Sequence, residues 1–151
     1  MRIKAACTLL AAISLDGKFL STDFSPSLLC HRLLPLEAFP VNLFTDLPVH
    51  LDQEDQDQFV RLQPISLKTF KEIIARSHPF FLLGSPEANK MALLAGVVQR
   101  ISLLWIPSFY VERKQCLIGE VDWRNKKMKW HLECWRVFPE GCACHYNIAD
   151  P

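Results

Sequence analysis

Residues 14–18, Ser-Leu-Asp-Gly-Lys, place an acid, a base and a glycine directly after the first apolar stretch of the chain. If that stretch is a strand of an open α/β sheet, the loop lies at the strand's carboxyl end, where such sheets bind their ligands. Asp16 could orient the N–H groups of a pyrimidine, and Lys18 could bind a phosphate or assist hydride transfer electrostatically. A solvated Asp-Gly turn is the commoner outcome for these residue types, so both interpretations stay open here.

A second candidate site is the Gly84-Ser85-Pro86 turn between an apolar stretch and a helical pattern. Backbone N–H groups in the first turn of a helix lack intrahelical partners, so they could hold a phosphate or pyrophosphate without any lysine. Most α/β crossovers have Gly or Ser at this turn, and Glu87 would repel a close phosphate. The turn alone therefore favours phosphate binding only weakly.

The elements that position these loops follow from hydrophobic patterning. Residues 3–14 are apolar without polar alternation, which predicts a central strand covered on both faces. The start, Met1 to Lys4, imitates the basic region of a signal peptide, but the apolar stretch runs directly into the 14–18 loop, which favours a strand. Further strands are expected at residues 41–45, 59–62, 79–83 and 100–110, and helices at 28–36, 66–77 and 86–95.

Two of the helices carry clear end signals. Ser66 and Ser85 are predicted N-caps, Pro86 is suited to the first helical position, and Gly96 is suited to the end of the same helix. Residues 79–110 therefore predict a β-α-β crossover.

The last quarter of the chain changes its period. Every second residue of 128–134 is apolar, a turn follows at Pro139-Glu140-Gly141, and alternation resumes over 142–148. This pattern predicts an antiparallel hairpin. We expect one domain over residues 1–151, an α/β fold with a mostly parallel sheet, the hairpin at one side and helices packed on it.

Composition narrows the function. Half of the 151 residues are apolar and the formal net charge is +1, so no global attraction for nucleic acid or an anionic membrane is expected. No stretch is long enough for a transmembrane helix. Six cysteines accompany a full apolar core, which predicts reduced, buried thiols in a cytoplasmic protein. Cys134, Cys142, Cys144 and His145 lack the usual zinc spacing, so no metal is expected.

The chain also resembles a known family. Residues 11–18, Ala-Ala-Ile-Ser-Leu-Asp-Gly-Lys, look like the opening of the C-terminal reductase domain of the bacterial riboflavin-biosynthesis deaminase-reductase, which is dihydrofolate-reductase-like. Residues 80–87, followed by 91–98 and 101–107, are similar to that family's strand, Gly-Gly phosphate loop, helix, and strand ending in proline. The resemblance covers most of the chain.

The resemblance implies an NADPH-dependent reductase that converts a ribosylaminopyrimidine phosphate to the ribitylamino compound, with a homodimer possible. It places Asp16 and Lys18 in catalysis. The implied cofactor contacts are Ala12 and Ser14 near the nicotinamide, and Gly84, Ser85, Pro86 and Glu87 against the phosphates. Hydride transfer is cofactor chemistry, so the protein has to hold the two rings in contact and exclude water.

Two departures from the family point to an alternative. Ser85 replaces the second glycine of the phosphate loop, and the chain is shorter between Lys18 and Val41, where the family's Asp-Pro-x-Leu-Thr segment is not found. His31-Arg32 is at most a remnant of the helix that precedes this segment in the family. The alternative is a non-catalytic homologue that acts as a subunit or interaction partner. Exposed Trp135 and Phe138 would support this alternative.

Overall fold

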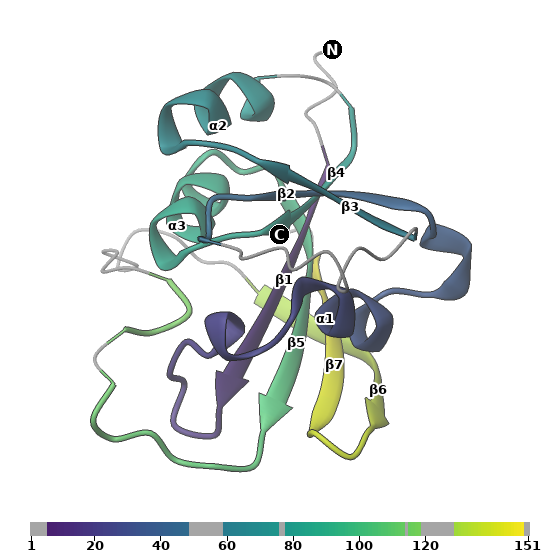
Figure 1. Cartoon of the computed structure of the whole chain (residues 1–151), viewed down its shortest axis with the longest axis vertical. Helices are drawn as coiled ribbons and strands as arrows, with labels where there is room; N and C mark the ends of the chain where they lie inside the picture. Colours follow the sequence, from purple (N-terminus) through teal and green to yellow (C-terminus); the bar gives the residue numbers. More distant parts are fainter. Residues whose placement is uncertain (1–5, 49–58, 76–77, 114, 119–128, 150–151) are drawn as a thin grey trace.

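A seven-stranded mixed sheet in the order β3-β2-β4-β1-β5-β7-β6 forms the centre of the computed structural model (Figure 1). The structure describes residues 6–48, 59–75, 78–113, 115–118 and 129–149. The strands are β1 (Cys7–Ser14), β2 (Val41–Thr45), β3 (Val60–Pro64), β4 (Phe80–Leu83), β5 (Val98–Ile106), β6 (Lys129–Val137) and β7 (Cys142–Ala149). The helices are α1 (Pro26–Leu33), α2 (Leu67–Ile74) and α3 (Pro86–Leu94), with 3-10 turns η1 (Ser21–Asp23) and η2 (Leu36–Ala38).

The predicted fold class is confirmed. β3, β2, β4, β1 and β5 pair in parallel, and β7 and β6 add an antiparallel hairpin at the β5 side. β1 is central and almost wholly buried, as its uninterrupted apolar run predicts. β4 and β5 are not neighbours, because β1 lies between them, so the crossover through α3 passes over β1.

Helices cover both faces of the sheet. α2 and α3 pack on the face that carries Leu9 and Ala11 of β1, and Phe70 of α2 is fully buried there. α1 packs on the opposite face through Leu29, Cys30 and Leu33, against Leu10 and Ala12. Alternate residues of β1 therefore enter two different cores. Among the described residues, no helix is long and apolar enough to cross a membrane.

The capping predictions are confirmed, whereas several boundaries shift. Ser66 and Ser85 cap α2 and α3 by accepting N–H bonds from Thr69 and Ala88. α1 begins at Pro26 and ends at Leu33, against the expected 28–36, because Pro26 occupies the first helical turn and Pro35 holds Leu34 extended. β5 begins at Val98 and stops before Pro107, and β3 is shifted to Val60–Pro64.

The C-terminal hairpin differs from a simple alternation. A bulge between Leu132 and Cys134 makes Glu133 an extra residue, so that Cys134 pairs with His145 and Trp135 pairs with Cys144. Cys134 therefore lies on the opposite face from Leu132, contrary to the predicted pattern. Trp135 continues the apolar face in its place.

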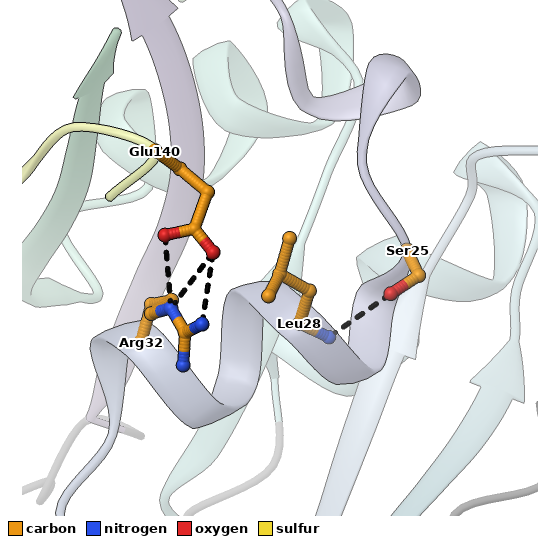
Figure 2. A network of polar contacts seen from close by, with 4 residues as sticks. All are labelled: Ser25, Leu28, Arg32 and Glu140. Atoms are coloured by element: carbon orange, nitrogen blue, oxygen red, sulfur yellow. Dashed lines mark hydrogen bonds and ion pairs between the residues drawn. The ribbon is translucent and has the colours of Figure 1, made fainter. Parts of the chain in front are cut away.

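An ion pair ties α1 to the β6–β7 turn. Figure 2 shows the Arg32 guanidinium facing the Glu140 carboxylate, and Ser25 capping α1 through the Leu28 N–H. Arg32 Nε and Nη2 donate to Glu140 at 3.2 and 2.8 Å, and the Arg32 guanidinium also lies 4.9 Å from the centre of the Phe138 ring. Arg32 therefore holds the hairpin turn against the helix.

Candidate functional site

The two predicted loops lie at the carboxyl ends of neighbouring parallel strands, but they are offset along the strand direction. β1 and β4 are parallel neighbours, and both loops lie at the carboxyl ends of their strands, since Ser14 ends β1 and Gly84 follows β4. Leu9 pairs with Leu82, which puts Leu83 level with Leu10, four residues short of Ser14 (14 − 10). At about 3.3 Å per residue, the two loops are offset by about 13 Å along the strands.

Residues 14–18 form a tight, internally bonded loop. The Ser14 hydroxyl donates to Asp16 Oδ1 and accepts from the Lys18 N–H at 2.9 Å. The Tyr110 N–H, which follows β5, donates to the same carboxylate oxygen at 3.2 Å. The Ser14 hydroxyl, then the Tyr110 N–H and the Lys18 charge lower the pKa of Asp16. Asp16 is therefore an ionised acceptor whose first partners belong to the loop itself.

Lys18 is half-buried in the same loop. Ser14, Asp16 and Lys18 lie together, because Ser14 bonds to both other residues and the Lys18 charge acts on Asp16. Its backbone pairs with Cys116 in an antiparallel bridge, which sets the 115–118 segment beside the loop. The three side chains supply a hydroxyl, a carboxylate and an ammonium group at the end of the central strand.

Asp46 is a site residue that the sequence reasoning missed. It follows β2, the neighbour of β4, and its carboxylate accepts the Ser85 N–H at 2.7 Å and the Ser85 hydroxyl at 2.5 Å. An anion thus already lies at the amino end of α3, where a phosphate was expected. A phosphate that uses the Ser85 N–H has to displace Asp46.

Other groups at this helix end are also engaged. The Ser85 hydroxyl accepts from the Ala88 N–H, Pro86 has no N–H and is buried, and the Glu87 side chain is exposed on the first turn. Glu87 adds a second negative charge close to the helix end. The amino end of α3 is therefore satisfied mainly by carboxylate and cap rather than left open for an anion.

Ala12 is also engaged by the chain itself. It is fully buried, its N–H donates to the Ser21 hydroxyl at 3.0 Å, and its carbonyl accepts the Leu20 N–H at 2.9 Å. β4 stops short of this part of β1, so residues 19–21 fold back and take the place of a strand neighbour. Ala12 can meet a nicotinamide only if Leu20 and Ser21 move away.

Gly84 is packed against α3. A Cβ on Gly84 would lie 2.7 Å from Asn89 Oδ1 and 3.0 Å from Ala88 Cβ. Asn89 is fully buried, donates through Nδ2 to the Leu117 carbonyl, and its Oδ1 has no hydrogen-bond partner among the described residues. Gly84 is therefore required for the close approach of β4 to α3, whether or not a phosphate binds.

The cysteines are thiols, and all six lie in the described ranges without a disulfide. Cys7 and Cys30 are buried, whereas Cys116 and Cys134 are exposed, so the expectation of uniformly buried thiols was wrong. Within the described parts of the chain, no three His, Cys, Asp or Glu side chains gather as metal ligands would. His145 points away from Cys144 and shares a hydrogen bond with Ser102 at 2.8 Å.

Known structures share this fold across nearly the whole chain. A pyrimidine reductase-like protein from Corynebacterium diphtheriae has a TM-score of 0.62 at 14% identity, over 97% of this chain and 93% of that one. The riboflavin biosynthesis reductase of Saccharomyces cerevisiae has a TM-score of 0.55 at 13% identity, over 99% and 92%. Dihydrofolate reductase from Enterococcus faecalis, in complex with NADP(H), has a TM-score of 0.54 at 11% identity, over 99% and 100%.

No protein-family model matches the chain, and no curated protein matches it in sequence. The resemblance read from the two loops is confirmed at the level of the fold, with riboflavin-biosynthesis reductases and dihydrofolate reductase among the similar structures. The chain has the dihydrofolate-reductase-like fold, which is the fold of oxidoreductases of these two kinds.

Proposed function

We propose that this chain is an NADPH-dependent reductase of the riboflavin-biosynthesis type, which reduces a ribosylaminopyrimidine phosphate to the ribitylamino compound. The observation that carries the proposal is the placement of the 14–18 loop and the amino end of α3 at one edge of two neighbouring parallel strands. The offset of about 13 Å between them suits an elongated dinucleotide, with its phosphates at α3 and its ring at the end of β1.

The residues present fit this cofactor once two internal contacts open. Displacement of Asp46 frees the Ser85 N–H for a phosphate, and movement of Leu20 and Ser21 frees the backbone of Ala12. When bound, NADPH supplies the hydride. Lys18 would hold the substrate phosphate or stabilise developing negative charge, and Asp16 would orient pyrimidine N–H groups.

The state of the cysteines bears on the cellular compartment in which the protein acts. Six thiols without a disulfide suit a reducing compartment. We therefore propose that the reductase acts in the cytoplasm.

A titration of tryptophan fluorescence with NADPH tests the cofactor. Saturable quenching below millimolar cofactor is expected, and Lys18→Gln should weaken substrate turnover more than cofactor binding. Lys129→Gln is the matched control, because Lys129 is an exposed lysine on β6, the outermost strand, separated from β1 by β5 and β7. Absence of saturable quenching removes the reductase proposal.

The second candidate is a non-catalytic homologue that serves as a subunit or forms a homodimer. It is favoured by the engagement of Ser85 and Ala12 within the chain, and by exposed apolar side chains on β6. Leu132, Trp135 and Val137 are 51%, 63% and 67% exposed, and Phe138 is half-buried under Arg32. A dimer in sedimentation velocity together with no NADPH binding supports this candidate. A monomer that binds NADPH contradicts it.

A further inference from the structure

Two thiols on β7 lie unusually close together. Cys142 and Cys144 are two residues apart on one strand, so both side chains point to the same face, and their Sγ atoms are 3.7 Å apart. Both residues are half-buried, on the face of the hairpin that α1 does not cover. Neither thiol has a role in the proposed reductase.

The separation of the sulfur atoms suits one bridging atom better than a direct disulfide. Two sulfurs bound to one tetrahedral zinc ion at about 2.3 Å each lie about 3.8 Å apart. A disulfide requires about 2.05 Å between the sulfurs, and two residues along a strand put the Cα atoms about 6.6 Å apart, at the upper end of disulfide geometry. The pair can therefore chelate with little movement of the strand.

The surroundings of the pair are apolar and aromatic. Trp105 of β5 and Val137 of β6 flank Cys142, and Leu103 and Trp135 flank Cys144. The Trp105 Nε1–H donates to the Tyr146 hydroxyl at 3.2 Å, which fixes its indole over β7. The bulge at Glu133 is what brings Trp135 to this face.

The protein offers two sulfur ligands here and no third. Cys134 lies on the other face with His145, and within the described residues no group of three metal-ligating side chains is found. A ligand for this pair must bring its remaining substituents with it.

We propose that Cys142 and Cys144 form a dithiol site for monosubstituted trivalent arsenicals, R–As(OH)₂. Each thiol replaces one hydroxide, so two As–O bonds break and two As–S bonds form. The two thiol protons leave with the hydroxides as two water molecules. Arsenic stays trivalent, nothing is oxidised or reduced, and the group R lies among Trp105, Trp135 and Val137.

The number of ligands selects this class over a divalent cation. A tetrahedral zinc ion takes four ligands, and the described residues supply two here, which leaves two positions open. A monosubstituted arsenical needs only two sulfur ligands, because its third substituent is already bound to arsenic. It condenses with two protonated thiols and gives a neutral product.

Phenylarsine oxide, hydrated in water to the dihydroxide, is the probe. The full chain is mixed with one equivalent in excess 2-mercaptoethanol, which competes with adducts to single thiols, and is analysed by intact mass and by mapping of the bridged peptide. We expect one arsenic per chain, bridging Cys142 and Cys144, quenching of tryptophan fluorescence, and release by 2,3-dimercaptopropanol. A bridge mapped to any other pair, or no adduct, overturns the proposal without the need for a variant.

Variants then test the chelate. Cys142→Ser and Cys144→Ser should each retain the adduct about 100-fold less strongly, because the second sulfur binds intramolecularly. Cys134→Ser and Cys116→Ser, which remove exposed single thiols, should retain it like the wild type. Unchanged retention in Cys142→Ser contradicts the proposal. Excess Zn²⁺ should leave the adduct intact, and displacement by Zn²⁺ would refute the selectivity for arsenic.

Discussion

The carboxylate of Asp46 at the amino end of α3 allows a sharp test of cofactor binding. Replacing Asp46 by Asn keeps the size of the side chain and an oxygen acceptor for the Ser85 N–H, while the new amide can donate to the Ser85 hydroxyl. The substitution removes one negative charge from the place where a phosphate of NADPH has to bind.

The size of the effect follows from Coulomb's law. A phosphate next to the carboxylate lies about 5 Å from it, where two unit charges repel by about 0.8 kcal/mol in water and about 3 kcal/mol at an effective dielectric of 20. Since Asp46 is half-buried, the gain lies between these limits. Asp46→Asn should therefore lower the Kd for NADPH by roughly 4-fold to 150-fold.

Fluorescence titration at low and high salt measures this gain, which should shrink at high salt because screening weakens the repulsion. Glu133→Gln on β6 is the control, since it changes the net charge equally at the far edge of the sheet. Equal or weaker binding by a folded Asp46→Asn protein refutes the reasoning. An equal gain in Glu133→Gln would assign the effect to net charge rather than to Asp46.

Three further predictions concern stability. The pKa of Asp16 is lowered in the folded chain, so its contribution to stability is present above pH 3.8, the ordinary value, and is lost as the pH falls through the folded value. The free energies of unfolding of wild type and Asp16→Asn, measured in urea, should therefore converge at acidic pH. A constant difference would contradict this. A Cβ at Gly141 would lie 2.1 Å from the Trp105 carbonyl oxygen. Gly141→Ala should therefore lower the free energy of unfolding in urea by about 2 kcal/mol or more. An unchanged midpoint would show that β5 and β7 do not approach tightly here. Arg32 lowers the pKa of Glu140 through their ion pair. A double-mutant cycle of Arg32→Met and Glu140→Gln should therefore show a favourable coupling free energy at neutral pH, which disappears as acid protonates Glu140. Coupling that persists in acid would exclude the ion pair as its source.

Short sequence patterns predicted the features that are determined by residues close together in the chain. The caps at Ser66 and Ser85, the central position of β1 and the hairpin all follow from short patterns. The start of α1 was predicted two residues too late, at residue 28, although proline at position 26 suits the first turn of a helix.

What depends on the order of strands could not be predicted. Asp46 and Ser85 are 39 residues apart and meet only because β2 lies next to β4. An acidic residue directly after a strand was the available signal, but the pairing of strands was needed to use it. The bulge left a trace in the sequence, because apolar residues change phase between Leu132 and Trp135.

A Gly84→Val substitution is unsuitable as a test of phosphate binding at the amino end of α3. Its side chain would clash with Asn89 and Ala88, so loss of binding would report damage to α3. The structure therefore directs the test to Asp46, whose replacement keeps the packing.

Residues 19–21 cover the side of β1 that β4 leaves unpaired, and this arrangement has a dynamic consequence. These residues are close in sequence to the strand they cover, so detaching them breaks a few bonds to Ala12 and Ile13 while the pairing of β1 with β5 remains. Local opening should therefore require less free energy than global unfolding. Amide deuterium uptake at Leu20 should be faster than at Leu104, which lies deep in β5. Added NADPH should change the uptake rate at Leu20 more than the uptake rate at Leu104.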